Sequence, residues 1–243
     1  MRTVCTIEAR MTSSRLPGKV LLEAAGKPLL AHMIERLRRA RTLDEIVIAT
    51  TEEASSDPIV ALAQELGVGC FRGSEDDVLG RVLGAARAYD AELIVETTGD
   101  CPLIDPAIVD EIVERFRDGG VDYCSNTLER TYPRGMDVQA FPFAVLEEVD
   151  RLTDDPADRE HVSLYIYEHP ERYELRSVRS QRPETGDLRL TVDTPDDLAL
   201  IRAVLEELYP NDPEFGLDDI LALLDARPDL VELNRHVEQK RVR

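Results

Sequence analysis

Positive charge is scarce in this 243-residue sequence, which has 29 lysine and arginine residues against 49 aspartate and glutamate residues, a formal net charge of −20. Lysine occurs only as Lys19, Lys27 and Lys240, so arginine supplies nearly all the cations. This composition excludes general nucleic-acid binding, which needs a basic face. An acidic, lysine-poor surface suits a high-salt environment, where salt screens the repulsion between the negative charges. A GC-rich genome would give the same excess of arginine over lysine, so the composition does not decide the habitat of the source organism.

Long apolar runs are also absent. No stretch approaches the ~20 residues that a membrane-spanning helix needs. The first residues, Met-Arg-Thr-Val-Cys, contain no secretory apolar core, so a cytoplasmic protein without a membrane partner is expected. The four cysteines are widely scattered and include no C-x-x-C pair, so neither a zinc site nor a disulfide framework is predicted.

Against this acidic background, one loop carries only positive charge. The stretch from Ala9 to Leu22 follows a short apolar strand and contains Arg10, Arg15 and Lys19 but no acid. Two forked guanidiniums and one ammonium, on a loop of small residues, suit the oxygens of a polyphosphate. The alternative is a solvated basic loop, which is a common surface feature.

Two familiar phosphate-binding motifs do not fit this loop. A P-loop requires a glycine, four residues, and then Gly-Lys-Ser/Thr. Here Gly18-Lys19 is followed by Val20, and Ser13 stands at the first glycine position. The dinucleotide pattern G-x-G-x-x-G is missing as well, so a nucleotide bound here would be held by another scheme.

Short apolar runs alternate with helical patterns through the first half of the chain. This rhythm predicts βαβ units and an α/β fold with an open, doubly wound, mainly parallel sheet, whose ligand crevice lies at the carboxyl ends of the strands. Strands are expected at Thr3–Ala9, Glu45–Thr50, Val68–Arg72, Glu92–Thr97 and Asp122–Ser125, with helices at about 28–41, 57–66, 77–89 and 105–116.

Between about Leu128 and Arg182 the rhythm changes. With no repeat and no linker-like stretch, residues 1–243 are interpreted as a single domain with an inserted subregion at about 128–182. The later elements are expected as a loop entering a strand at 132–141, a helix at 159–168, strands at 173–178 and 188–192, and helices at 194–209 and 217–226.

Two aspartates directly follow apolar strands. Asp100 ends the run Ile94-Val95-Glu96-Thr97-Thr98-Gly99, and Asp193 ends Leu188-Arg189-Leu190-Thr191-Val192. Carboxylate oxygens at a sheet edge beside a basic loop fit a Mg²⁺-nucleotide site, because Mg²⁺ prefers carboxylate and phosphate oxygens. The alternative is that both aspartates only cap helices, since Pro102 and Pro195 follow closely.

Five ordered segments share a resemblance to one enzyme family. They are Arg10-x-x-x-x-Arg15-Leu16-Pro17-Gly18-Lys19; Phe71-Arg72-Gly73-Ser74 with the acidic run to Arg81; Gly99-Asp100-Cys101-Pro102-Leu103-Ile104; Tyr132-Pro133-x-Gly135-x-Asp137 with Arg159-Glu160-His161-Val162; and Thr191-Val192-Asp193-Thr194-Pro195. Together they resemble the cytidylyltransferases that activate sugar acids, which include the synthetases of CMP-Kdo and of CMP-sialic acids. The similarity is greatest to the spore-coat polysaccharide branch.

The resemblance implies a nucleotide-diphospho-sugar transferase-like, Rossmann-like fold and specific contacts. Asp100 and Asp193 are the expected metal ligands. Expected nucleotide contacts are Ala9, Arg10, Ser14, Arg15, Lys19, Arg72, Gly73, Ser74, Arg81 and Asp100, and expected acceptor contacts are Tyr132, Arg134, Asp137, Gln139, Glu160 and His161. Gln139 departs from the pattern, because relatives often carry an acid there, and His161 is equally compatible with a structural role.

The expected reaction is transfer of a cytidylyl group from CTP to a small anionic sugar, with Mg²⁺ as cofactor, to give a CMP-sugar and pyrophosphate. Arg10, Arg15, Lys19, Asp100 and Asp193 are the expected catalytic residues. The alternatives are a nucleotidyltransferase of the same fold with another base or a phosphorylated non-sugar acceptor, and a catalytically inactive nucleotide-binding subunit. A homodimer is expected, with aromatic residues of the inserted subregion in the contact.

Overall fold

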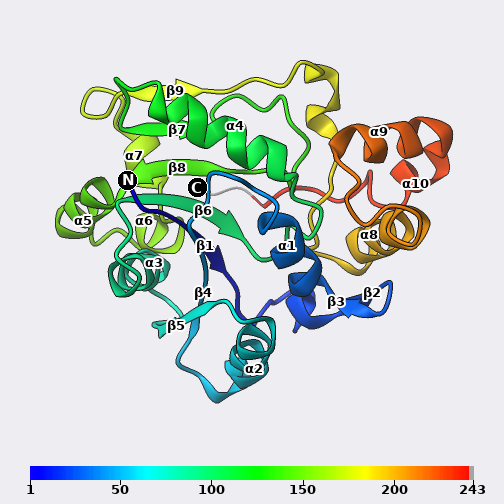
Figure 1. The fold of residues 1–243 in the computed structure, drawn as a ribbon, viewed down its shortest axis with the longest axis horizontal. Coiled ribbons are helices and arrows are strands. Elements are labelled where there is room, and N and C mark those ends of the chain that lie inside the picture. Colours follow the sequence, from blue (N-terminus) through cyan, green and yellow to red (C-terminus); the bar gives the residue numbers. More distant parts are fainter. Residues whose placement is uncertain (241–243) are drawn as a thin grey trace.

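The computed structural model describes residues 1–240, and within them seven strands form one sheet in the order β5-β4-β1-β6-β8-β7-β9 (Figure 1). Counted from the edge strand β5, the first four strands of this order are parallel to one another. Strand β8 runs antiparallel to both of its neighbours, β6 and β7. The predicted α/β class with a mainly parallel sheet is therefore confirmed. The strands are β1 (Thr3–Glu8), β4 (Glu45–Thr51), β5 (Gly69–Gly73), β6 (Leu93–Thr98), β7 (Tyr123–Ser125), β8 (Gln139–Pro142) and β9 (Leu175–Ser177).

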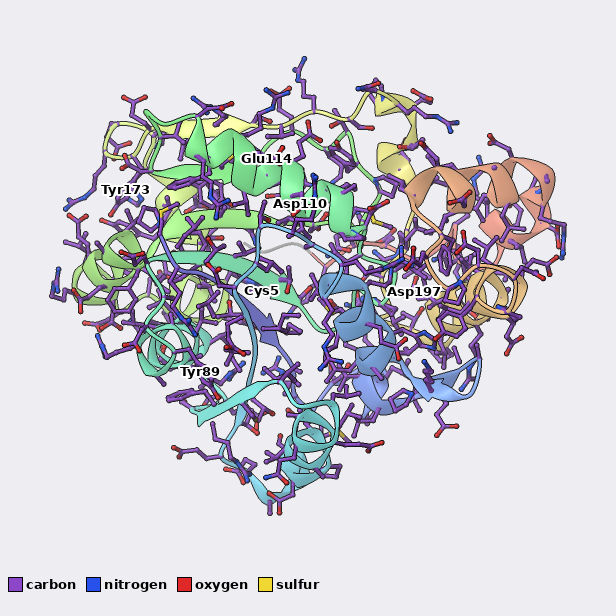
Figure 2. All side chains as sticks on the ribbon, in the orientation of Figure 1. Cys5, Tyr89, Asp110, Glu114, Tyr173 and Asp197 are labelled. Carbon is purple, nitrogen blue, oxygen red and sulfur yellow. The ribbon has the colours of Figure 1, made fainter. Side chains whose placement is uncertain are left out.

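Helices cover both faces of this sheet, because the central strands are apolar on both sides. Cys5 and Ile7 of β1 point to one core, while Val4 points to the other. Figure 2 shows Cys5 near the middle of the molecule. The first core is packed by α1 (Leu29–Leu37), α2 (Asp57–Leu66), α4 (Pro106–Arg117), α8 (Pro195–Leu208), α9 (Leu217–Ala226) and α10 (Pro228–Glu232), and the second by α3 (Val78–Ala88), α5 (Phe143–Leu152) and α7 (Leu164–Glu168).

Local signals in the sequence explain where several helices begin and end. Helix α4 follows Asp105, whose carboxylate accepts a hydrogen bond from the backbone of Ala107. Helix α2 stops at Gly67, which adopts φ 62° and so ends the helix in the left-handed conformation that glycine tolerates. Helix α8 opens with a reciprocal capping box between Thr194 and Asp197.

The region after residue 125 differs most from the prediction. The helix expected at 159–168 is two short helices, α6 (Pro156–Glu160) and α7, separated by a break at His161, whose backbone is not helical. The strand expected at 188–192 was wrong, since this segment makes only an isolated bridge from Arg189 to Arg134. Helix α5 and the small antiparallel pair β2 (Glu23–Ala24) and β3 (Lys27–Pro28) were not predicted.

Strands of the expected inserted subregion extend the main sheet. β8 pairs with β6 and β9 pairs with β7, so the segment from 128 to 182 contributes to both the sheet and the second core. Two aromatic residues expected at a dimer contact, Tyr132 and Phe141, are buried inside the chain instead. None of the helices within residues 1–240 has the length and apolar character needed to cross a membrane.

The chain order of the strands creates a crevice beside β1. From β1 the chain moves to β4 and β5 on one side and then returns to β6 on the other. At such a reversal, the loops that leave the two neighbouring strands diverge and leave a space at their carboxyl ends. Here the loop after β1 and the loop after β6 bound that space.

Candidate active site

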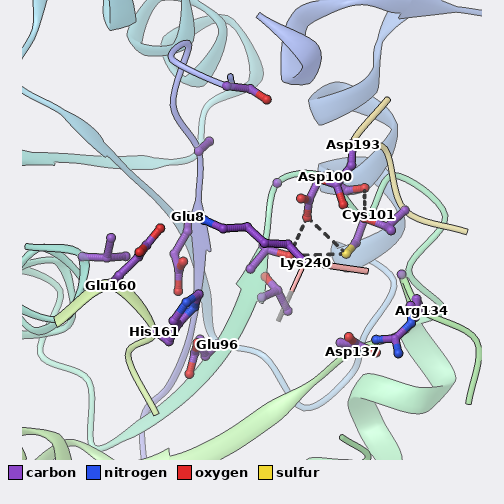
Figure 3. A pocket seen from close by; sticks show the side chains of 18 of the residues that line it. Glu8, Glu96, Asp100, Cys101, Arg134, Asp137, Glu160, His161, Asp193 and Lys240 are labelled. Carbon is purple, nitrogen blue, oxygen red and sulfur yellow. Dashed lines mark hydrogen bonds between the residues drawn. The ribbon is translucent and has the colours of Figure 1, made fainter. Parts of the chain in front are cut away.

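A cavity of about 510 Å³ lies at the carboxyl ends of β1 and β6. Its volume is within the range of roughly 300–1,000 Å³ typical of small-molecule sites. Among the residues predicted for the site, those that line the cavity are Ala9, Arg10, Ser14, Arg15, Lys19, Arg81, Asp100, Arg134, Asp137, Gln139, Glu160, His161 and Asp193. Figure 3 shows Asp100 and Asp193 together, Glu8, Glu96, Glu160 and His161 as a second group, and Arg134 with Asp137 as a third.

One ammonium group joins Asp100, which follows β6, and Asp193, which precedes α8. Lys19 Nζ lies 2.7 Å from Asp100 Oδ2 and 2.8 Å from Asp193 Oδ1. Arg15 Nη2 lies 3.0 Å from the same Asp193 oxygen. The basic loop and both aspartates therefore form one charged cluster, which a freely solvated loop would not.

The local fold of the basic loop aims Lys19 at the aspartates. Gly18 adopts φ 68° and donates a backbone hydrogen bond to the carbonyl of Met11, so the loop turns back on itself. A short 3₁₀ helix, Lys19–Leu21, then starts at once and buries Val20 in the core. Lys19 is thus fixed by its buried neighbour rather than carried on a free loop.

The charges in this cluster reinforce one another. Burial alone would lower the pKa of Lys19, but the carboxylates of Asp100 and Asp193 outweigh burial and raise it. Burial likewise favours the protonated form of Asp193, and Lys19 and Arg15 outweigh that effect to lower the pKa of this carboxyl. The lysine is therefore protonated and Asp193 is ionised near neutral pH.

A buried network behind Asp193 holds it in place. Arg189 Nη2 lies 3.1 Å from Asp193 Oδ2, and its Nε lies 3.1 Å from Asp197, which is fully buried. Asp197 also accepts the backbone N–H of Asp193 and an amide hydrogen bond from Asn234. Asp197, labelled in Figure 2, lies in the first turn of α8. The sequence prediction missed this network, because Arg189 stood in an apparent strand and Asn234 in a polar tail.

Four predicted contacts lie outside the cavity lining. Arg72 sits on edge strand β5, two strands from β1, and its guanidinium donates to the carbonyls of Thr51, Glu52 and Glu53 and pairs with Asp57. All its nitrogens are therefore engaged by the loop after β4. Its neighbours Gly73 and Ser74 and the buried Tyr132, which donates to Glu111, are likewise absent from the lining.

Two arginines lie near Asp137 in the cavity wall. Arg130 is engaged by that carboxylate, whereas Arg134 is not. Arg130 forms two hydrogen bonds to the carboxylate of Asp137, so the oxygens of Asp137 are already engaged. Arg134 lines the same side of the cavity, and within residues 1–240 its guanidinium has no salt-bridge partner. Burial lowers the pKa of Arg134, and nearby Arg130 lowers it further, so an anionic ligand here would relieve an unpaired charge.

Several lining residues carried no recognisable signal in the sequence. Glu8 and Glu96 belong to apolar strands, and the C-terminal segment brings Gln239 and Lys240 to the cavity. Arg189 Nη1 donates to Gln239 Oε1 at 2.6 Å, which ties that segment to the network behind Asp193.

The pKa of His161 is lowered chiefly by burial, so this side chain is neutral near pH 7.

Comparisons with known proteins agree with this arrangement. Residues 4–240 match the family model for cytidylyltransferases. The chain is 32% identical to the spore coat polysaccharide biosynthesis protein SpsF of Bacillus subtilis, over 92% of this chain and 94% of that protein. It is 31% identical to a 3-deoxy-manno-octulosonate cytidylyltransferase of Anaeromyxobacter sp. strain K, over 84% of this chain and 98% of the relative.

A solved structure extends the likeness to the whole fold. A cytidylyltransferase from Leptospira borgpetersenii superposes with a TM-score of 0.91 at 32% identity, covering 99% of each chain. Together with the family match, which spans nearly the whole sequence, this similarity confirms the resemblance inferred from the five segments. The chain belongs to the cytidylyltransferase family.

Proposed function

We propose that this enzyme transfers a cytidylyl group from CTP to a small acidic sugar and releases pyrophosphate, with Mg²⁺ as cofactor, to supply CMP-sugar for surface polysaccharide or glycan synthesis. The observation that carries the proposal is the convergence of Lys19, Asp100 and Asp193 at the carboxyl ends of the strands. The name of one relative, a 3-deoxy-manno-octulosonate cytidylyltransferase, supports this class of substrate, and the name of the other supports a role in polysaccharide synthesis.

The two aspartates suit a divalent ion that shares its ligands with a nucleotide. Both carboxylates contact the Lys19 ammonium, and the Thr98 hydroxyl donates to Asp100 Oδ1 at 2.6 Å and orients it. Within residues 1–240 no group of three or more histidine, cysteine or acidic side chains is arranged so that it could hold a metal ion, so phosphate oxygens and water would complete the shell around two aspartates, as Mg²⁺ prefers. When bound, the ion supplies positive charge at the phosphate and acceptor oxygens.

The cations of the basic loop act on the leaving group. In the reaction an acceptor hydroxyl attacks the α-phosphorus, the bond from that phosphorus to the pyrophosphate oxygen breaks, and the hydroxyl proton is lost to solvent. Arg10, Arg15 and Lys19 stabilise the charge that grows on pyrophosphate. Lys19 can turn to phosphate once its carboxylate partners bind a metal. Positioning and electrostatics therefore carry most of the catalysis.

The acceptor is placed where Arg134 and the segment leading to β8 line the cavity. Arg134 is the proposed clamp for its carboxylate, because a planar guanidinium can hold both oxygens. The lack of an acidic partner for Arg134 among the described residues favours this role over a simple surface ion pair. Glu160 and His161 lie on another side of the same cavity and are proposed to contact sugar hydroxyls.

The test is incubation of the protein with Mg²⁺, one nucleoside triphosphate at a time, and a panel of acidic sugars that includes 3-deoxy-manno-octulosonate and N-acetylneuraminate. Pyrophosphate release is the readout. The proposal predicts release with CTP and at least one acid, and little with ATP, GTP or UTP. Release with another base, or only with a phosphorylated non-sugar acid, would replace the CTP and sugar assignment with the same-fold alternative.

We also propose that the enzyme is a homodimer that uses the surface of residues 128–182. Phe143, Tyr165 and Tyr167 are only partly buried in the chain, and Leu152 is 41% exposed. They leave aromatic and aliphatic surface near α5 and α7 for a partner copy. Light scattering at micromolar concentration should give the mass of two chains, and a monomer in high salt would contradict the proposal.

A further inference from the structure

Two glutamates meet on one face of the sheet at the cavity. Thr6 of β1 pairs with Glu96 of β6, and Glu8 pairs with Thr98, so Glu8 and Glu96 stand two positions apart on the same face of adjacent strands. Both line the cavity, and Figure 3 shows them in the group with His161. Their position was dictated by the register of β1 and β6, which the sequence alone does not reveal.

One carboxyl oxygen of each glutamate is buried and short of a donor. Glu96 is only 5% exposed, and its Oε2 makes no close hydrogen bond among the described residues. Glu8 Oε1 is in the same state. The two side chains hydrogen-bond to each other through a shared proton, which leaves the pair with more acceptor oxygens than donors. A donor from a group in the cavity would offset the cost of burying those oxygens.

The guanidinium of Arg81 makes no hydrogen bond to either glutamate. Arg81, on α3, stabilises the ionised form of Glu8 by its charge, but the hydrogen bonds of its Nη1 go to the carbonyls of Ser74 and Glu75. Burial and Glu96 dominate over Arg81 and hold the pKa of Glu8 well above its usual range. Burial also raises the pKa of Glu96, to about 7, and the side chain of Glu8 hydrogen-bonds to this carboxyl.

Gln139 and Ser163 complete this group on the β8 side. The Gln139 carbonyl oxygen accepts hydrogen bonds from Tyr123 at 2.5 Å and from Ser163 at 2.6 Å, so it has no remaining capacity for a ligand donor. These two bonds turn the Gln139 amide nitrogen toward Glu96, whose ionised form it stabilises. Gln139 therefore leaves the two glutamates as the side chains with unmet acceptor capacity at this end of strands β1 and β6.

We propose that Glu8 and Glu96 are specificity-determining residues that accept hydrogen bonds from hydroxyl or amino groups on the part of the acceptor remote from its carboxylate. This inference rests on the proposed function. It gives the acceptor a polarity: its anionic group lies at Arg134, and its donor-bearing end lies at the glutamate pair, on a different side of the cavity in Figure 3. A carboxylate or phosphate at the glutamate end would be repelled, because it has no donor and carries like charge.

The first arm of the test separates a binding role from a structural one without any substrate. Glu96→Gln preserves shape and removes the buried charge, so the variant's thermal midpoint should rise by roughly 2–6 °C if the carboxyl is not needed for folding. Glu8→Gln is treated in the same way, with Glu65→Gln on the exposed side of α2 as the matched control. A lower midpoint for Glu96→Gln would overturn the proposal, because it would show that the carboxyl supports the fold.

The second arm measures kinetics with 3-deoxy-manno-octulosonate and with its amino-substituted analogue, in Mg²⁺ and CTP. Both glutamine variants should raise the KM of the acceptor at least roughly tenfold, because a polar site loses its best hydrogen bonds. The KM of CTP and the behaviour of Glu65→Gln should stay within about twofold of the unsubstituted enzyme. A larger effect on the amine than on the hydroxyl compound would identify the amine as the preferred donor.

The outcomes separate this inference from the proposed function. An unchanged acceptor KM would overturn the assignment of the glutamate pair while leaving the transferase proposal intact. A loss confined to CTP affinity would also overturn it, because the pair would then read the nucleotide. Absence of turnover with every acid and every nucleotide would contradict the proposed function, and the thermal midpoint of Glu96→Gln would then decide whether the pair is a site.

Discussion

Lys19 and Asp193 form an ion pair, 2.8 Å from Nζ to Oδ1, although 174 positions separate them in the chain. The contact joins the loop after the first strand to the segment that precedes α8. It exists because both segments reach the carboxyl edge of the sheet at the reversal of strand order beside β1. The cluster of Lys19, Asp100 and Asp193, together with Arg134 and Glu96 elsewhere in the cavity lining, leads to the following predictions.

Asp100→Asn and Asp193→Asn should each reduce turnover by more than the ~10–100-fold typical of residues that only orient a metal ligand. The reason is that each substitution removes a negatively charged oxygen that Mg²⁺ requires. Asp196→Asn is the matched control, since Asp196 lies on the exposed side of α8 and pairs with His236 away from the cavity. Either active-site variant with near-normal turnover at saturating Mg²⁺ would refute the ligand role of that aspartate.

Lys19→Ala and Arg15→Ala should weaken binding of CTP much more than binding of CMP, because their proposed target is the pyrophosphate portion that CMP lacks. Calorimetric titrations with both nucleotides measure the difference. Lys27→Ala is a suitable control, because Lys27 pairs with Glu35 and Tyr209 and does not line the cavity. Equal losses for CTP and CMP would show that the loop contacts another part of the nucleotide.

Arg134→Ala should raise the KM of the acceptor strongly, by roughly 2–3 kcal/mol in apparent binding, if a charged hydrogen-bonded pair is lost. CTP binding should remain nearly unchanged, because the proposed contact of Arg134 is with the acceptor and not with the nucleotide. Arg179→Ala removes an exposed guanidinium that pairs only with Glu129 and controls for net charge. Best activity on a neutral sugar, or an unchanged acceptor KM, would remove Arg134 from the site.

The stabilising effect of Glu96→Gln should depend on pH. Burial raises the pKa of Glu96 to about 7, above its ordinary value, so the native protein binds this proton more tightly than the unfolded chain. The associated stability is present at low pH and is lost as pH rises through 7. The variant keeps a neutral group throughout, so its advantage in thermal midpoint should be small at pH 5 and larger at pH 8.

The groups that face Glu96 limit how this result is interpreted. Glu8, Gln139, Ser163 and the more distant Arg81 surround it and are unchanged in the variant. Acid-sensitive ion pairs elsewhere affect both proteins alike and cancel in the difference. A constant difference between pH 5 and pH 8 would mean that Glu96 does not titrate in this range.

The parallel half of the fold was predictable because its signals are local. Alternating apolar strands and capped helices placed β1, β4 and β6, and the rule that ligands bind at strand reversals brought the basic loop to Asp100. In the second half, the strands expected at 122–125 and 173–178 were found as β7 and β9, but α5, the break at His161 and the lack of a strand at 188–192 were not foreseen. These features depend on contacts with distant segments rather than on the local sequence pattern.

The limits of prediction within the site have the same physical origin. Arg72 resembled a nucleotide contact, but edge strand β5 directs it to the carbonyls that follow β4. Glu8 and Glu96 were unremarkable acids within apolar strands until the register placed them side by side. Charges carried on one loop can be read from sequence, whereas a pair built across two strands requires the structure.

The central claim is that the α-phosphorus of CTP is transferred to a sugar acid, and ³¹P NMR follows that atom directly. With Mg²⁺, CTP and an active acid from the panel, the account predicts that the α-phosphorus signal of CTP is replaced by that of a phosphodiester, together with one equivalent of free pyrophosphate. Asp100→Asn should leave the CTP spectrum unchanged over the same time. Appearance of CDP and inorganic phosphate, or loss of CTP without a phosphodiester product, would contradict the account.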